Sequence, residues 1–208
     1  TSISPKVSGY IVKSYITDNQ KVHKGDLLVQ IDERDYQTAL TQANAHLAVT
    51  QASESNLIAE QALQNSHIHQ AQSGVASAQA EYDRASQQVT RSRSLLKKHY
   101  ASQDELDSML AQQKVTLAQL HEAQANLEAA SDQLDVISSQ IVQAQASVKE
   151  AKAGVTQAQL NLQYTKIYAP ADGIIGKRSV REGLLTQAGT PLMSLVPDNA
   201  VWVEANFK

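Results

Sequence analysis

The sequence predicts an α+β fold, in which a long antiparallel α-helical hairpin is inserted into a small β-domain. Three observations lead to this prediction. Proline and glycine gather at the two ends of the chain, a coiled-coil repeat fills the middle, and the two ends resemble each other. The hairpin would bring the ends together, so that they fold as one domain.

Breakers of regular structure are nearly absent from the middle of the chain. No proline lies between Pro5 and Pro170, and of the eight glycines only Gly74 and Gly154 lie between residues 25 and 173. Because proline and glycine interrupt helices, this middle is free to be helical and the flanks are not.

The first helical arm is predicted from an apolar stripe that steps alternately by four and three residues. An average step of about 3.5 residues is typical of a coiled-coil seam. The seam is polar at several positions between Thr50 and Gln64. The stripe consists of Tyr36, Leu40, Ala43, Leu47, Thr50, Glu54, Leu57, Gln61, Gln64, Ile68, Ala71, Val75, Ala78, Tyr82, Ala85, Val89, Ser92 and Leu96.

A second stripe predicts the returning arm. It consists of Leu106, Leu110, Gln113, Leu117, Leu120, Gln124, Leu127, Ser131, Leu134, Ile137, Ile141, Ala144, Val148, Ala151, Val155, Ala158 and Leu162. The two successive steps of three around Leu134 predict a stammer, which would overwind the pair locally.

A turn is predicted near residues 99–103, between the two stripes. Lys97, Lys98 and His99 place positive charge at the end of the first helix, where its dipole is negative. Ser102 and Glu105 match a capping box at the start of the next helix. Arms joined by so few residues must run antiparallel.

The flanking segments 3–31 and 167–195 read as short strands and superpose without a gap. The most informative matches pair residues that tolerate a positive φ at turns. They are Gly9 with Gly173, Asn19 with Gly183, and Gly25 with Gly189. This internal repeat predicts a quasi-symmetric β-sandwich built from both ends of the chain.

Composition excludes several classes of function. A net charge of -3 and a pI near 6.0 give no electrostatic footprint for nucleic acid. The chain has no cysteine, and His67 and His69 lie on different faces of a helix, so we expect no metal site. No catalytic motif is present, and we expect neither enzymatic activity nor a cofactor.

Four motifs follow one another along the chain, at Ser4–Gly9, Ile167–Gly173, Val180–Gly183 and Val196–Lys208. Taken in this order, they resemble the periplasmic adaptors, or membrane fusion proteins, of the HlyD family, and most closely their EmrA-type branch. It implies a split lipoyl-like domain, a barrel-sandwich hybrid, interrupted by a coiled-coil hairpin.

The resemblance divides the chain into four parts. It implies one lipoyl-like half at 1–32, the hairpin at 33–163, the second half at 164–197, and the start of a truncated β-barrel domain at 198–208.

The resemblance also implies a docking site at the hairpin tip. Many such adaptors contact an outer-membrane channel through an arginine, a leucine four residues later and a serine seven residues after the leucine. Arg91, Leu95 and Ser102 match that spacing. Arg91 and Leu95 lie one helical turn apart and share a face. An ordinary surface arginine, a packing leucine and a helix cap would give the same pattern.

As a family member the protein would be a periplasmic adaptor of tripartite multidrug efflux. It would be anchored to the inner membrane by an N-terminal segment absent from this chain, and would associate with itself into a ring. Its partners would be an outer-membrane channel of the TolC type and an inner-membrane transporter, with the major-facilitator type favoured over the ABC type.

Other functions remain open. The nearest alternative is an adaptor of type I protein secretion. A biotin or lipoate carrier is disfavoured, because Asp32–Asp35 and the helical insertion replace the attachment lysine of such domains. A purely structural coiled coil is disfavoured by the β-repeat.

Overall fold

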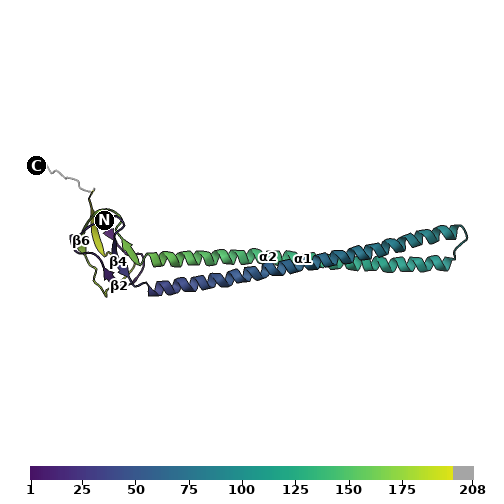
Figure 1. Ribbon diagram of the computed structural model, residues 1–208, viewed down its shortest axis with the longest axis horizontal. Helices are drawn as coiled ribbons and strands as arrows, with labels where there is room; N and C mark the ends of the chain where they lie inside the picture. Colours follow the sequence, from purple (N-terminus) through teal and green to yellow (C-terminus); the bar gives the residue numbers. More distant parts are fainter. Residues whose placement is uncertain (199–208) are drawn as a thin grey trace. The chain divides into compact units, whose positions relative to one another are not determined.

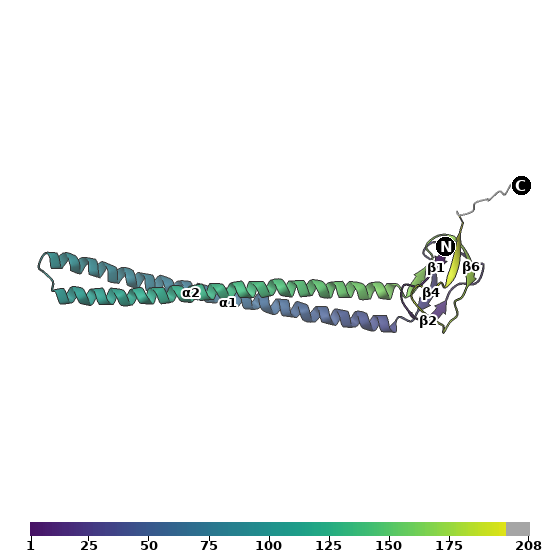
Figure 2. The ribbon, with the colours of Figure 1, turned by 180° about the vertical axis from the view of Figure 1, so that it is seen from behind.

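The computed structural model describes residues 1–198. The predicted start of a β-barrel domain therefore lies outside the described residues from residue 199 on. The chain divides into two compact units. One contains Thr1–Val49 and the chain from Val148 on, and the other contains Thr50–Ser147. Figures 1 and 2 show the same ribbon from opposite sides.

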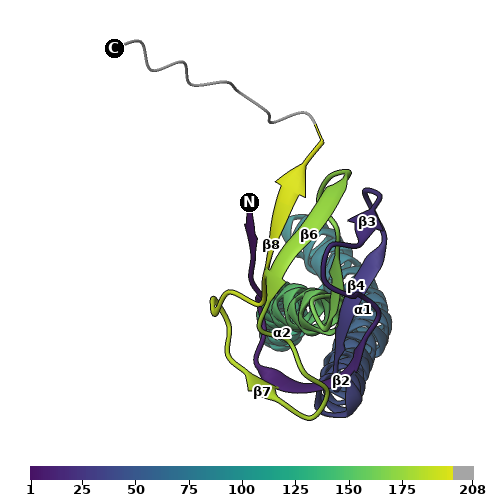
Figure 3. The ribbon, with the colours of Figure 1, turned by 90° about the vertical axis from the view of Figure 1, so that its left-hand side faces the viewer.

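Eight strands of the first unit form two antiparallel sheets of four strands each, with the orders β1-β8-β6-β3 and β5-β4-β2-β7. The strands are β1 (Ser2–Ile3), β2 (Gly9–Ser14), β3 (Lys21–Val22), β4 (Leu27–Ile31), β5 (Lys166–Tyr168), β6 (Gly173–Arg178), β7 (Leu185–Thr186) and β8 (Met193–Pro197). Figure 3 looks onto this domain and shows β6 beside β8 and β7 along β2.

Each sheet takes strands from both ends of the chain. The central pair β2–β4 of one sheet is flanked by β5 and β7, whereas the central pair β6–β8 of the other is flanked by β1 and β3. Neither half therefore contains a complete sheet. The prediction of one split β-domain around a helical insertion is confirmed.

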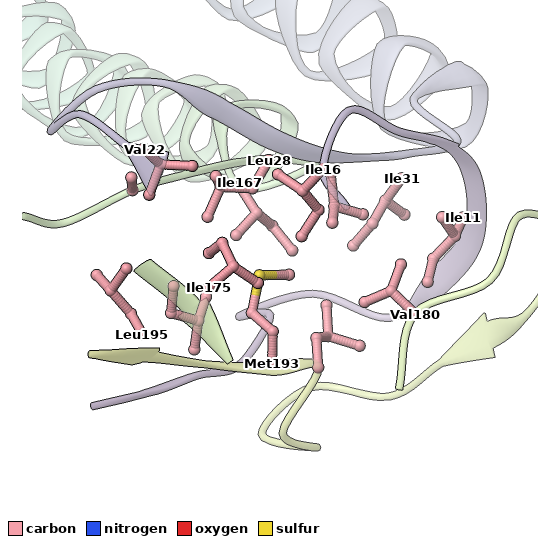
Figure 4. Packing of buried hydrophobic residues seen from close by; sticks show 14 of the residues in the cluster. Ile11, Ile16, Val22, Leu28, Ile31, Ile167, Ile175, Val180, Met193 and Leu195 are labelled. Carbon is pink, nitrogen blue, oxygen red and sulfur yellow. The ribbon is translucent and has the colours of Figure 1, made fainter. Parts of the chain in front are cut away.

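The core of this domain repeats the symmetry of the sequence. The buried cluster consists of Ile3, Val7, Ile11, Ile16, Val22, Leu28, Val29, Ile31, Ile167, Ala169, Ile175, Val180, Leu192, Met193 and Leu195. Ile11 and Ile175 occupy equivalent positions of the repeat, as do Ile31 and Leu195, and all four are at most 1% exposed. Their side chains converge between the two sheets in Figure 4. Burial thus confirms the internal repeat.

Two of the three informative pairs lie at turns with positive φ, as predicted. Asn19 has a φ of 64° where Gly183 has 79°, and Gly25 has 95° where Gly189 has 84°.

The third pair, Gly9 and Gly173, is required for a different reason. A Cβ on Gly9 would lie 2.6 Å from Cγ2 of Ile31, and one on Gly173 would collide with the backbone of Val196. These two glycines let neighbouring strands approach closely.

Two long helices, α1 (Arg34–Lys97) and α2 (Gln103–Gln163), lie between β4 and β5 in the sequence. In the second unit they run antiparallel, and two hydrogen bonds cross between them. Gln61 donates to the Ser138 hydroxyl over 3.3 Å, and Gln64 donates to the Ala130 carbonyl over 2.8 Å. Every residue of the predicted first stripe is buried or partly buried, which confirms the seam of α1.

The predicted phase break in α2 is wrong. Gln124 and Ser131 are exposed, while the preceding Ala123 and Ala130 are partly buried. The seam positions therefore alternate by three and four throughout, with no stammer at Leu134.

Candidate docking site at the hairpin tip

The first helix ends in a complete Schellman motif. The amide of Tyr100 donates to the carbonyl of Leu95, and the amide of His99 donates to the carbonyl of Leu96, both over 3.0 Å. His99 takes the left-handed position, with a φ of 60°, which glycine usually occupies. The motif turns the chain within five residues, from Lys98 to Ser102.

The second helix begins with the predicted serine cap. The Ser102 hydroxyl accepts a hydrogen bond from the amide of Glu105 over 3.2 Å. This bond is one half of the predicted capping box. Gln103 donates to Asp107 over 3.1 Å on the next turn of the same helix. Ser102 itself is exposed, so its place in the tip is compatible with contact to a partner.

The side chains of Arg91 and Leu95 point away from the seam. The nearby seam residues Val89 and Ser92 are buried, whereas Arg91 is exposed and Leu95 is 39% exposed. Arg91 and Leu95 also line a shallow polar groove on α1, together with Ser86, Gln87, Thr90 and Ser94. The structure thus places the guanidinium and the leucine on one exposed face, next to the turn that carries Ser102.

Tyr100 adds an aromatic ring that the sequence motif did not include. It is 81% exposed at the apex of the turn. An exposed tyrosine offers both an apolar ring and a hydroxyl, a combination enriched at protein interfaces. The residue after the left-handed position of a Schellman motif commonly packs on the last helical turn, so the exposure of Tyr100 could not be predicted from the sequence.

A row of cations is a second feature that motif matching did not find. Arg84 and Lys98 lie seven residues before and after Arg91, and all three are exposed. Seven residues are close to two helical turns, so Arg84 and Arg91 follow one line along α1, and Lys98 lies just past its end. The spacing of the three cations was visible in the sequence.

Just before α1, the chain forms a charged Asx turn. The Asp32 carboxylate accepts from the backbone amide of Arg34 over 3.1 Å and lies 2.6 Å from its guanidinium. The hydrogen bonds from Arg34 hold the pKa of Asp32 at about 2. No lysine lies between Ile31 and Tyr36, so this turn gives no attachment point for biotin or lipoate.

The first turn of α1 is tied to the β-domain. The Tyr36 hydroxyl donates to the Ser8 carbonyl over 2.6 Å, and Lys166 lies 3.6 Å from Glu33. The amide of Ile31 donates to the carbonyl of Thr165 over 2.8 Å, joining the last residue of β4 to the segment before β5.

Within residues 1–198 no group of three or more histidine, aspartate or glutamate side chains is arranged to hold a metal ion. In the same range, neither helix contains a stretch apolar enough to span a bilayer.

Comparison with known families and proteins gives a consistent result. The model of the barrel-sandwich hybrid domain of RND membrane fusion proteins matches residues 1–197. The colistin resistance protein EmrA of Acinetobacter baumannii is 36% identical over 208 residues, which are 100% of this chain and 59% of that protein. The multidrug export protein EmrA of Haemophilus influenzae is 32% identical, over 99% of this chain and 50% of that protein. The chain thus spans little more than half of these relatives.

Solved structures share the fold. The periplasmic adaptor protein EmrA superposes with a TM-score of 0.56 at 16% identity, over 94% of this chain and 71% of that one. The soluble domain of LipC, a membrane fusion protein of a type I secretion system, also gives 0.56, at 17% identity, over 95% of this chain and 99% of that one. The chain therefore belongs to the membrane fusion proteins of the HlyD/EmrA type.

Proposed function

We propose that this chain is the central part of an adaptor that links an inner-membrane exporter to an outer-membrane channel in tripartite multidrug efflux. The observation that carries the proposal is the exposed pair Arg91 and Leu95, at the tip of a hairpin inserted into a barrel-sandwich hybrid domain. The names of the EmrA and MdtN relatives, which refer to multidrug export and resistance, support the efflux class.

Each part of the chain has a role in this proposal. Residues 1–32 and 164–197 form one domain that associates into a ring, and residues 33–163 form the arm. A segment N-terminal to residue 1 anchors the protein to the inner membrane, so that the arm lies in the periplasm. The partners are a TolC-type channel and a transporter, preferably of the major-facilitator type.

The chemistry of the tip suits recognition of a protein surface. Arg91 presents five N–H donors in a planar fork, which match a carboxylate or a pair of carbonyls. Leu95, one turn away, supplies apolar area that is removed from water on contact. Hydrogen bonds to a charged group contribute about 1.5–3 kcal/mol each, and arginine is enriched at interface hot spots.

The proposal is tested with the purified channel and two variants, Arg91→Asp and Leu95→Ser. Each should weaken channel binding at least about tenfold, because loss of a hot-spot side chain costs more than about 1.4 kcal/mol. Binding is measured by surface plasmon resonance, and helicity by circular dichroism.

Arg93→Asp is the matched control. Arg93 is an exposed arginine on the same helix, but two residues from Arg91, and therefore on a different face. It carries the same change of charge and should bind nearly as the wild type does. Unchanged binding of both tip variants, with helicity retained, would refute docking through Arg91 and Leu95.

An adaptor of type I protein secretion is the second candidate. It is favoured by the LipC fold, which this chain resembles as closely as it resembles the EmrA adaptor structure. Co-purification of the full-length protein from its own cells decides between the candidates. A major-facilitator exporter in the complex supports drug efflux, and an ABC transporter supports protein secretion.

A further inference from the structure

The strands β1 and β5 are edge strands that occupy equivalent positions of the internal repeat. Each pairs on one side only, β1 with β8 and β5 with β4. At the offset of the repeat, Ser2 corresponds to Lys166 and Ile3 to Ile167. An edge strand carries backbone amides and carbonyls that no neighbouring strand bonds, so it can pair with another chain.

The two edges line one groove of the β-domain. A hollow of about 440 Å³ is lined by residues 1–6 and by residues of the segment 164–170. A second hollow, of about 600 Å³, shares Tyr164, Lys166 and Tyr168 with the first and continues to Leu162. Both hollows therefore adjoin β5, and together they form an elongated groove along this strand.

The backbone of β5 has unpaired groups at its outer edge. Ile31, at the end of β4, donates to the Thr165 carbonyl over 2.8 Å, and the segment just before β4 exchanges two hydrogen bonds of 2.9 Å with Ala169. In an antiparallel pair, every second residue directs its amide and carbonyl toward the partner strand. Lys166 and Tyr168 alternate with these residues, so their amides and carbonyls are directed away from β4.

The groove carries positive charge. Lys6 and Lys166 line it, and among the described residues no aspartate or glutamate does so. The Lys6 ammonium lies 4.5 Å from the centroid of the Tyr164 ring and takes part in no ion pair within residues 1–198. Lys166 lies 3.6 Å from Glu33. An ammonium on the face of a ring keeps N–H donors for a carboxylate partner.

We propose that this groove binds an extended, acidic segment of a partner protein, which adds as a strand to the free edge of β5. The backbone of the segment pairs with Lys166 and Tyr168, one of its carboxylates lies against Lys6, and its apolar side chains contact the rings of Tyr164 and Tyr168. In strand addition the backbone hydrogen bonds supply affinity, and the side-chain contacts supply specificity. This binding site belongs to the β-domain and is independent of docking at the hairpin tip.

The lysines have an alternative role as guards of the edge. Lysine on an edge strand disfavours pairing with other chains, and Lys166 suits this role. Lys6 does not, because it lies between β1 and β2, outside any strand, with its ammonium over the Tyr164 ring. The position of Lys6 therefore favours binding over protection.

The probes are labelled octapeptides of alternating valine and glutamate, or of alternating valine and lysine. Binding to the chain is measured by fluorescence anisotropy up to about 1 mM peptide. The acidic peptide should bind at least about tenfold more tightly than the basic one, because only its charge is opposite to that of Lys6 and Lys166. A fully N-methylated acidic peptide has no amide donors, so it should bind at least about tenfold more weakly than its parent.

Lys6→Glu is the test variant, and Lys13→Glu is its matched control. Lys13 also holds its ammonium over a ring, 5.1 Å from the centroid of Tyr15, but it lies on β2 and outside the groove. Lys6→Glu should weaken binding of the acidic peptide about tenfold or more, whereas Lys13→Glu should bind within about threefold of the wild type. Circular dichroism checks that both variants fold. An equal loss in both would reduce the effect to net charge and overturn the proposed site.

Hydrogen exchange, resolved by residue with NMR, shows whether a strand is added. With the acidic peptide bound, the amides of Lys166 and Tyr168 should exchange at least about tenfold more slowly, because they gain carbonyl partners. If the peptide bound without slowing these amides, strand addition would be wrong. Failure of the acidic peptide to bind would also overturn the proposal and leave the lysines as guards of the edge. Slow exchange of both amides without peptide, at raised protein concentration, would assign the edge to a second copy instead.

Discussion

At the scale of single residues, Ser92 shows a compromise inside the coiled-coil seam. It is 6% exposed, and its hydroxyl has no hydrogen-bond partner among the described residues. An unsatisfied buried hydroxyl costs about 1–3 kcal/mol, and serine is also a poorer helix former than alanine. Ser92→Ala should therefore raise the free energy of unfolding by about 1 kcal/mol, measured by urea denaturation followed by circular dichroism.

Ser94→Ala is the control for helix propensity alone. Ser94 lies two residues further along α1 and is exposed. Its substitution should add only a few tenths of a kcal/mol. If the two variants were equally stable, the buried hydroxyl of Ser92 would carry no penalty.

The sequence predicts the conformation of an individual residue well where one physical property determines it. Asn19 and Gly183 were predicted at turns because few residues tolerate a positive φ, and the structure places both there. His99 was not predicted in that conformation, because its side chain gives no local signal for it. Its φ is fixed by the hydrogen bonds of the Schellman motif, to which the neighbouring Tyr100 contributes.

At the scale of elements, the turn between the helices holds a histidine where glycine is favoured. A left-handed φ costs a non-glycine residue about 1 kcal/mol. His99→Gly should therefore stabilise the hairpin. The net gain should be about 0.5–1 kcal/mol after subtraction of the larger entropy that glycine has in the unfolded chain. Thermal unfolding followed at 222 nm measures the change.

Lys98→Gly is the matched control, one residue earlier. Lys98 precedes the left-handed residue and has no positive φ, so glycine there gains nothing and should destabilise the hairpin by about 0.5–1 kcal/mol. If both substitutions stabilised the hairpin, the left-handed conformation of His99 would not be the reason for the gain in stability.

The two arms differ in how well their sequences predict them. In α1 large seam residues such as Ile68 and Tyr82 stand among polar neighbours, so the seam is unambiguous. In α2 alanines lie at the seam and beside it, and Ala123 and Ala130 contrast little with their surroundings. Thr116 was missed as well, since its buried hydroxyl bonds to carbonyls of its own helix, 3.0 Å from Gln113 and 3.3 Å from Gln112.

At the scale of the whole molecule, the β-domain should not need the outer part of the hairpin. Every residue of its buried core comes from residues 3–31 or 167–195. Replacing residues 50–147 by a loop of about five residues rich in glycine and asparagine should leave a folded domain, because a shorter connection costs less entropy to close. Dispersed amide proton signals and a cooperative thermal transition would show this.

Gly173→Ala in the shortened chain serves as the negative control. Its Cβ would collide with the backbone of Val196, which cannot move as a flexible side chain can, so this variant should lose stability or unfold. An unfolded shortened chain with Gly173 intact would show that the outer hairpin contributes to the folding of the β-domain.

The fold could be predicted at this scale because its two signals span the whole chain. The repeat and the seam each depend on many residues, so single misreadings such as Gln124 and Ser131 did not change the architecture. The docking site is different. Arg91, Leu95 and Ser102 were identified by resemblance, and their exposure at one end of the hairpin agrees with docking. The partner that they would bind depends on the sequence of another protein, so it could not be predicted from this one.

The pairing of β4 with β5 has a mechanical consequence. α1 starts just after β4 ends, and α2 ends just before β5 starts, so both arms leave from neighbouring ends of one antiparallel pair. A force that spreads the arms would peel this pair apart one hydrogen bond at a time, beginning at the bond from Ile31 to Thr165. The bond from Tyr36 to Ser8 and the ion pair of Glu33 and Lys166 lie beside this starting point and resist the opening. The hydrogen-exchange rate of the Ile31 amide should therefore rise when a force spreads the two arms.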